Sequence, residues 1–262
     1  MSDAGRPANR PNILFVFPDE LRPQALGFMR QDPVLTPNID RFAAESIVLT
    51  HCVSNFPVCT PFRGMFLTGR YPYQTGLISN CNTDTTAHGV FLKESERCLS
   101  DVLSAQGYDC GYIGKWHLDA PDPADAAWTE GRRGDGVIWD GYTPPGPRRH
   151  GFNFWYSYGC CDRHFDPHYW TGDAPVSGRI DPHLWSVEHE TNVAVDYIRN
   201  SAGCRRDETK PFCLVISHNP PHMPFAEVPD RYKALYAGRS PAELLNRPNL
   251  KDAGDGSNAL RH

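Results

Sequence analysis

The sequence has no long hydrophobic run. The apolar stretch nearest its start, residues 13–17, is only five residues long, whereas a membrane-spanning helix needs about 20 residues and the core of a secretory leader about 7–15. The first residues, MSDAGRPANRPN, are polar, and we expect residues 1–10 to be disordered. These features favour a cytoplasmic protein with no membrane partner.

A dense basic region and a regular cysteine pattern are also missing. The chain carries 26 Lys and Arg against 31 Asp and Glu, and its arginines form only short pairs such as Arg132-Arg133 and Arg148-Arg149. A nucleic-acid-binding surface needs a denser basic face, so we expect no nucleic-acid partner. The nine cysteines are odd in number and irregularly spaced, which is not typical of a disulfide framework.

What the sequence does contain is an alternation of short apolar runs with amphipathic segments. The runs at 12–17, 108–113 and 211–216 are typical of strands buried on both faces of a parallel sheet. Helices are predicted over 36–46, 61–68, 99–105 and 183–201, a strand or edge segment over 47–53, and a long loop over 119–150. This order predicts an α/β fold with helices on both faces of the sheet.

Polar side chains follow each of the three predicted strands. Because ligands of such folds bind at the carboxyl ends of the strands, these side chains are expected to share one site. Lysine and histidine two residues apart on a strand extension should also point to the same side. The residues concerned are Asp19, Glu20, Lys115, His117, His218 and His222.

The most informative segment is Cys59-x-Pro61-x-Arg63. Pro61 has the backbone geometry of a first helical residue, Thr60 can cap that end, and Gly69 is typical of the residue that follows a helix. Cys59 is therefore predicted at a helix N-terminus, a place that favours anions. Arg63 adds a planar positive donor one turn later.

This segment resembles the signature of type I sulfatases. Segments 12–20, 114–117 and 217–224 resemble further motifs of that family, in the family's order, so that the likeness covers about residues 10–250. The resemblance implies the fold of the alkaline phosphatase superfamily, with a mixed, mostly parallel sheet. It also implies hydrolysis of a sulfate ester, on a carbohydrate or an aryl alcohol.

The resemblance assigns catalytic roles to five residues. A formylglycine-generating maturation enzyme would oxidise Cys59 to an aldehyde, whose hydrate attacks the sulfur of the ester. Arg63 would hold that hydrate, and Lys115 would bind both it and a sulfate oxygen. His117 would act as a base, while His222 would bind sulfate and protonate the leaving alcohol.

The resemblance also implies a metal site and a second substrate contact. Asp19, Glu20 and the converted Cys59 would bind Ca²⁺ or Mg²⁺, which prefer oxygen ligands. The family usually has Asp or Gln where this chain has Glu20, so direct ligation by Glu20 is less secure than by Asp19. His218 ranks second to His222 as a sulfate-binding residue.

The chain departs from the family in its last part. No apolar strand follows Ile216, and Asp255 and Asn258 lie in a segment of turn composition that we interpret as a polar tail. Residues 11–262 therefore resemble an N-terminal catalytic domain that lacks the C-terminal metal-binding half and the small subdomain. We expect such a chain on its own to be impaired or inactive.

Other functions remain open at this point. A phosphonate or phosphodiester hydrolase of the same superfamily could use the same nucleophile. A truncated remnant could fold and bind anions without turnover, and an unmodified Cys59 with His117 could form a thiol hydrolase.

One further cluster allows two interpretations. Its soft ligands could hold zinc, although structural zinc sites normally use well-separated ligand pairs. The surrounding aromatic residues instead favour a wall for substrate recognition. The possible ligands are Cys160, Cys161, His164 and His168.

Overall fold

The computed structural model describes residues 10–129, 136–201 and 206–244. These residues form two compact units. One contains residues 10–20 and 53–227, and the other contains 21–52 and 228–244. The prediction of disorder for residues 1–10 falls almost wholly outside the described residues, as does the polar tail at 255–258. The predicted domain bounds stay a prediction.

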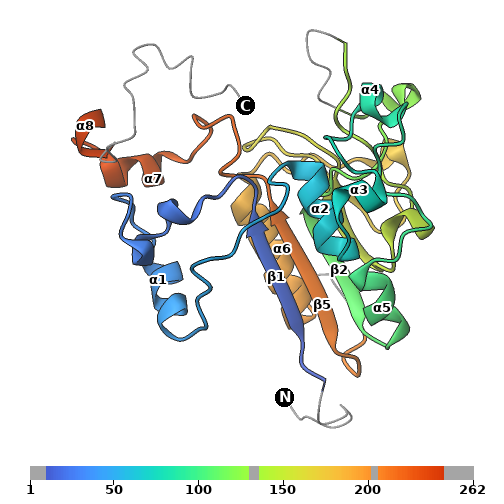
Figure 1. The fold of residues 1–262 in the computed structure, drawn as a ribbon, viewed down its shortest axis with the longest axis horizontal. Coiled ribbons are helices and arrows are strands. Elements are labelled where there is room, and N and C mark those ends of the chain that lie inside the picture. The colour runs from blue at the N-terminus through green and yellow to red at the C-terminus, as the bar shows by residue number, and fades with distance from the viewer. Residues whose placement is uncertain (1–9, 130–135, 202–205, 245–262) are drawn as a thin grey trace. The chain divides into compact units, whose positions relative to one another are not determined.

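A five-stranded sheet forms the centre of the first unit (Figure 1). Its order is β1-β5-β2-β3-β4, and every neighbouring pair is parallel except β3 with β4. The predicted α/β fold with a mixed, mostly parallel sheet is therefore confirmed. The strands are β1 (Ile13–Pro18), β2 (Asp109–Lys115), β3 (Phe154–Tyr158), β4 (Trp170–Thr171) and β5 (Phe212–His218).

Helices cover both faces of this sheet, as the alternation predicted. Alternate side chains of β2 and β5 enter two different hydrophobic clusters because successive strand residues point to opposite faces. Tyr112 and Val215 pack with Leu67 of α2 (Cys59–Thr68) and with residues of α5 (Leu99–Ala105). Ile113 and Leu214 pack with residues of α6 (Ser186–Arg199) on the other face. In Figure 1, α6 lies behind the strands and α2 in front of them.

Helix α2 begins two residues earlier than its sequence suggested. Cys59 is the first helical residue and Val58 the N-cap, so the expectation that Thr60 caps and Pro61 opens the helix is wrong. The first N–H groups of a helix have no partner inside it, so Pro61 at the third position removes no helical bond. The first such bond is donated by Phe62 N–H to Val58 O. Gly69 ends the helix in the left-handed conformation, as predicted.

The remaining elements of the first unit are short. The predicted loop at 119–150 contains, in its described part, only the 3₁₀ turns η3 (Pro123–Asp125) and η4 (Pro147–Arg149). Strands β3 and β4 were not predicted, because their aromatic residues were interpreted as a binding loop. The other short helices and turns are α3 (Pro72–Thr75), α4 (Thr83–Thr86) and η5 (Val176–Gly178).

The second unit is mostly helical. Its first segment is tied to its second by the Leu35 N–H, which donates to the Tyr236 hydroxyl at 2.9 Å. The strand predicted at 47–53 is wrong, since these residues adopt no regular structure and expose Ile47 and Leu49. The elements are η1 (Pro23–Ala25), η2 (Gly27–Met29), α1 (Pro37–Ala44), α7 (Asp230–Lys233), η6 (Ala234–Tyr236) and α8 (Pro241–Leu244).

No helix in the described ranges is both long enough and apolar enough to cross a bilayer.

Candidate active site

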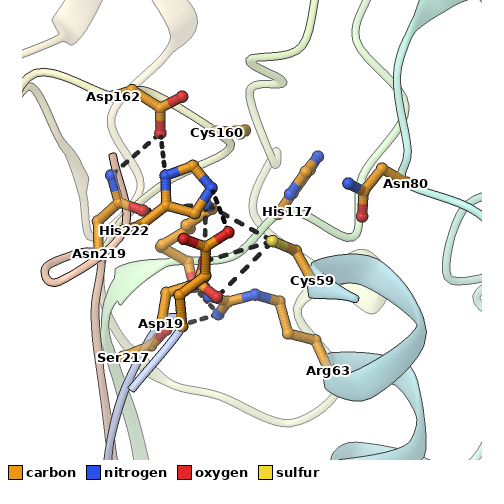
Figure 2. Close-up of polar contacts among 12 residues, drawn as sticks. Asp19, Cys59, Arg63, Asn80, His117, Cys160, Asp162, Ser217, Asn219 and His222 are labelled. Carbon is orange, nitrogen blue, oxygen red and sulfur yellow. Dashed lines mark hydrogen bonds and ion pairs between the residues drawn. The ribbon is translucent and has the colours of Figure 1, made fainter. Parts of the chain in front are cut away.

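A buried group of three charges lies at the carboxyl ends of β1 and β2 (Figure 2). The Asp19 carboxylate oxygen Oδ2 lies 2.8 Å from Lys115 Nζ and 3.2 Å from Arg63 Nη2. The Lys115 side chain is fully buried and that of Arg63 is 2% exposed. Two positive charges thus face one carboxylate in a place from which water is largely excluded.

Arg63 is held in this position by further bonds. Its Nη1 donates to Lys115 O at 2.6 Å and to Ser217 Oγ at 2.5 Å. The guanidinium therefore joins α2 to the ends of β2 and β5, and its planar set of donors suits this task better than an ammonium would. Its Nε is buried without a partner among the described residues.

The protonation of these groups follows from their mutual contacts. Burial opposes ionisation of Asp19, but Lys115 and Arg63 outweigh it and hold the pKa of that carboxyl well below its usual range. Burial also opposes the charge of Lys115, and Cys160 and Asp19 offset it, so the pKa of Lys115 is raised. Because burial raises the pKa of Cys160 to about 12, that thiol is neutral at pH 7 and Asp19 is the partner that matters.

Cys59 lies directly beside this group. Its thiol donates to Asp19 Oδ2 at 3.4 Å, and its Sγ lies 4.0 Å from Lys115 Nζ. The start of α2 is fixed by Thr60, whose N–H donates to Asn80 Oδ1 and whose hydroxyl donates to His117 O. The side chain at position 59 therefore has a defined place over the ends of β1 and β2.

His117 follows β2 and is buried. Its Nε2 lies 3.0 Å from Cys81 O, which can only accept, so Nε2 carries the proton and Nδ1 the lone pair. Burial, Lys115 and Arg63 lower the pKa of His117 to about 3. The imidazole is thus neutral at pH 7, and Nδ1 is a buried acceptor without a partner among the described residues.

His222 has the opposite character. Its Nδ1 lies 3.3 Å from Asp162 Oδ1, and its Nε2 lies 3.6 Å from Glu20 Oε1. Burial opposes its charge, but bonds to Asp162 and Cys59 outweigh that effect and raise the pKa of His222 to about 10. The site therefore presents one neutral and one protonated histidine.

The sequence can be matched to a known protein family. The profile of the Sulfatase family matches residues 11–249. The chain belongs to the sulfatase family. It is 44% identical to an endo-4-O-sulfatase of Bacteroides thetaiotaomicron, over 93% of this chain and 49% of that protein. It is 33% identical to an ulvan-active sulfatase of Formosa agariphila, over 92% of this chain and 40% of that protein.

A solved structure gives the same result for the fold. A Bacteroides thetaiotaomicron protein studied in the metabolism of multiple glycosaminoglycans superposes with a TM-score of 0.83 at 42% identity, covering 93% of this chain and 52% of its own. This sulfatase-family chain thus spans about half the length of the relatives it matches.

The structure places five of the eight predicted site residues in one group. Cys59, Arg63, Lys115, Asp19 and His222 are joined by the contacts given above, with Glu20 at its edge beside His222. The Glu20 side chain is 46% exposed. The backbone carbonyl of His117 accepts a hydrogen bond from the Thr60 hydroxyl at the start of α2. The φ of His117 is 49°, so the backbone is not extended there. The prediction that Lys115 and His117 point to the same side assumed an extended strand. The roles of all these residues stay predictions.

The eighth residue, His218, points elsewhere. Its Nδ1 lies 2.6 Å from Oε2 of Glu190, a fully buried residue of α6. Because Ser217 reaches Arg63 on the α2 face of the sheet, His218 is directed to the α6 face. The structure thus gives His218 a partner in the core, and its predicted contact with sulfate stays untested.

Two residues that the sequence interpretation missed connect the site. Asn219 accepts from Lys115 Nζ at 2.9 Å, and its amide donates to Asp162 at 3.2 Å. Asp162 in turn contacts His222. The alternation of β5 was the available signal, because it places Ser217 and Asn219 on the same side and His218 on the other.

The described residues fit part of a site for a hard cation. Ligand atoms of Asp19, Cys59 and His222 lie within 4.8 Å of one another. Ca²⁺ needs about six to eight oxygens, and this group supplies only the Asp19 carboxylate, with Glu20 nearby. The carboxylates of Asp19 and Glu20 are donors of the right type, but they form only one side of a site.

The cluster at 160–168 does not form a zinc site among the described residues. The four predicted ligands are not gathered into any of the metal-suited groups there. His168 Nε2 instead lies 2.8 Å from Asp140, and both side chains are fully buried. Tyr158, Tyr169 and Trp170 form a buried cluster, so most of the aromatic residues predicted as a recognition wall belong to the core.

Proposed function

We propose that this chain is the N-terminal half of an enzyme that hydrolyses sulfate esters of carbohydrates, with the side chain at position 59 as nucleophile. The observation that carries the proposal is the position of Cys59, 3.4 Å from Asp19 and 4.0 Å from Lys115 at the start of α2. The names of the relatives, an endo-4-O-sulfatase and an ulvan-active sulfatase, support a carbohydrate as the substrate class.

The charge of the site suits an anionic ester. Arg63 and Lys115 against Asp19 leave one positive charge in a buried place, and the protonated His222 adds to it. Attraction between a buried cation and a sulfate oxygen is only weakly screened. Lys115 would bind the sulfate group while its bond to Asn219 keeps its ammonium in place.

Formylglycine fits position 59. When formed there, it supplies a hydrated aldehyde that attacks sulfur and is regenerated after sulfate leaves. Two buried polar atoms of the residues predicted to contact the hydrate, Arg63 Nε and His117 Nδ1, lack partners among the described residues. Buried polar atoms are normally paired, and the two hydroxyls of such a hydrate would provide the missing partners.

The two histidines would divide the proton transfers. His117 Nδ1 can accept a proton because its Nε2–H is committed to Cys81 O. His222 can donate one from Nε2, since its Nδ1 faces Asp162. A neutral base and a charged acid at one site are what ester cleavage with an alcohol leaving group requires.

A divalent cation, Ca²⁺ or Mg²⁺, would add to the positive charge that attracts the sulfate group. Asp19, Glu20 and the converted residue 59 would hold one side of it, and residues outside this chain the other. A hard cation there would polarise the oxygen atoms bound to it. We therefore propose that the 262 residues alone turn over little substrate, and measurable turnover by the purified chain would contradict this.

The test is sulfate release by the product of the complete reading frame that contains these residues, made together with a formylglycine-generating enzyme. Sulfated glycosaminoglycan oligosaccharides and ulvan are the substrates, and an aryl phosphodiester tests the rival activity. We expect sulfate release that is lost in Cys59→Ala. Equal release by Cys59→Ala, or faster cleavage of the phosphodiester, would overturn the proposal.

A further inference from the structure

A second group of ligand-type side chains lies away from the active site, where α5 begins. Cys98 is the N-cap of α5, Asp101 lies in its first turn, and His150 follows the turn η4. One ligand atom from each of the three lies within 4.8 Å of the other two. The Cys98 and His150 side chains are at most 2% exposed, whereas Asp101 is 32% exposed.

This group is at the opposite end of β2 from Lys115. The Cys110 thiol, near the start of β2, contacts Ser100 O of α5. The five residues from Cys110 to Lys115 span about 16 Å in a strand. The two groups are therefore separate sites.

The distance between His150 and Asp101 is informative. Nδ1 lies 3.3 Å from Oδ2, whereas a hydrogen bond between an imidazolium and a carboxylate is about 2.7–2.9 Å. Two ligand atoms at about 2.0–2.2 Å from one tetrahedral zinc ion lie about 3.4 Å apart. The observed separation suits two ligands of one ion, and without an ion it suits an ordinary hydrogen bond between the two side chains.

The backbone holds the three side chains together. The Asp101 carboxylate accepts from the Cys98 N–H at 2.8 Å. Gly151, next to His150, packs so closely that a Cβ there would lie 2.9 Å from Ser100 O. His150 itself has a φ of 45°, which is uncommon for a residue other than glycine. The turn that carries His150 is thus pressed against the start of α5.

We propose that Cys98 Sγ, one Asp101 oxygen and His150 Nδ1 bind a single divalent ion of the zinc class. A water would take the fourth position on the side where Asp101 is exposed. Three ligand bonds form, and the Cys98 proton is released to solvent. The ion fixes the turn at 147–151 to α5. This site is independent of the sulfate-ester activity.

The test is titration of the purified, metal-free chain with Co²⁺, which replaces Zn²⁺ and absorbs light. We use the Cys59→Ser variant as the parent, because it removes the thiol of the other metal-suited group. The expected result is a thiolate-to-cobalt band in the near ultraviolet that saturates at one ion per chain. Added Zn²⁺ should abolish the band and raise the melting temperature.

Single substitutions show which residues bind the ion. Cys98→Ser in this parent should remove the band, whereas Cys52→Ser, which changes an exposed thiol, should leave it intact. Asp101→Asn keeps an oxygen for the Cys98 N–H but loses the charge, and should weaken Co²⁺ binding at least about tenfold. If Cys98→Ser fails to fold, Asp101→Asn still tests whether this group binds the ion.

Two outcomes would overturn the site. One is a parent protein without a thiolate-to-cobalt band. The other is a band of unchanged intensity and affinity in Cys98→Ser or Asp101→Asn.

Discussion

Lys115 Nζ lies 2.8 Å from Asp19 Oδ2, and the lysine side chain is fully buried. Removing one partner of a buried ion pair leaves the other charge uncompensated, at a cost of about 3–5 kcal/mol. Asp19→Asn should therefore lower the free energy of unfolding by about that amount, since it leaves both Lys115 and Arg63 without their carboxylate. Urea unfolding at pH 7 measures it.

A double variant distinguishes the loss of the ion pair from other destabilising effects of each substitution. Asp19→Asn combined with Lys115→Met should cost less than the sum of the two single changes. Arg22→Gln is the control, because Arg22 forms an ion pair with Asp32 while half exposed, and it should cost less than about 1 kcal/mol. An Asp19→Asn protein as stable as the Arg22→Gln protein would contradict the burial argument.

Stability should depend on pH through His117. Its pKa is lowered from 6.5 to about 3 in the folded chain, so between these values the unfolded chain binds the extra proton. The contribution is complete above pH 6.5 and is lost as the pH falls toward 3, by at most about 1.4 kcal/mol per pH unit. Urea midpoints at pH 7.5, 6 and 5 test this.

His117→Gln isolates this effect, since an amide can still donate to Cys81 O but does not titrate. The difference in unfolding free energy between the wild type and this variant should shrink as the pH falls from 7 to 5. His183→Gln changes a largely exposed histidine and should leave the pH dependence as in the wild type. A constant difference between wild type and His117→Gln would show that His117 titrates normally.

Asp162 should control the protonation of His222. Its carboxylate lies 3.3 Å from Nδ1, and the pKa of His222 is raised to about 10. Asp162→Asn removes that charge, so the pKa of His222 should fall toward 6.5, as followed by the ring resonances in NMR. Asp166→Asn, beside the exposed His183, is the control. An unchanged His222 titration in Asp162→Asn would refute the link.

Gly114 is the residue before Lys115 and has a φ of +94°. A Cβ there would lie 2.2 Å from Ser217 O, a backbone atom that cannot easily move. Gly114→Ala should therefore cost at least about 3 kcal/mol in unfolding free energy. Gly89→Ala is the matched control, because Gly89 also has a positive φ but open space around it. Equal losses of unfolding free energy in the two variants would show that the clash with Ser217 O does not destabilise Gly114→Ala.

Much of this arrangement followed from the sequence. The apolar runs predicted β1, β2 and β5, and the rule that ligands bind at strand ends predicted that Asp19 and Lys115 share one site. The ends of two strands were not predicted correctly. β2 and β5 extend two residues beyond their apolar runs, to Lys115 and His218, because buried charged and polar residues complete them.

Three features of the structure differ from the prediction or were not predicted, each for a physical reason. β3 was not predicted because its Phe-Trp-Tyr-Ser-Tyr sequence has no clear alternation of apolar and polar residues. The contact between Asp162 and His222 joins residues 60 positions apart, which local patterns do not reveal. The apolar segment at 47–53 formed no strand because β propensity alone does not supply a pairing partner.

The central claim is that residue 59 acts as a hydrated aldehyde. The most direct measurement is the mass of the peptide that contains residue 59, before and after reaction with a hydrazide probe. The peptide comes from the product of the complete reading frame, made together with a formylglycine-generating enzyme. The account predicts the mass of the aldehyde form and its capture by the probe, with neither in Cys59→Ala. A peptide that keeps its thiol and ignores the probe, in a preparation that releases sulfate, would contradict it.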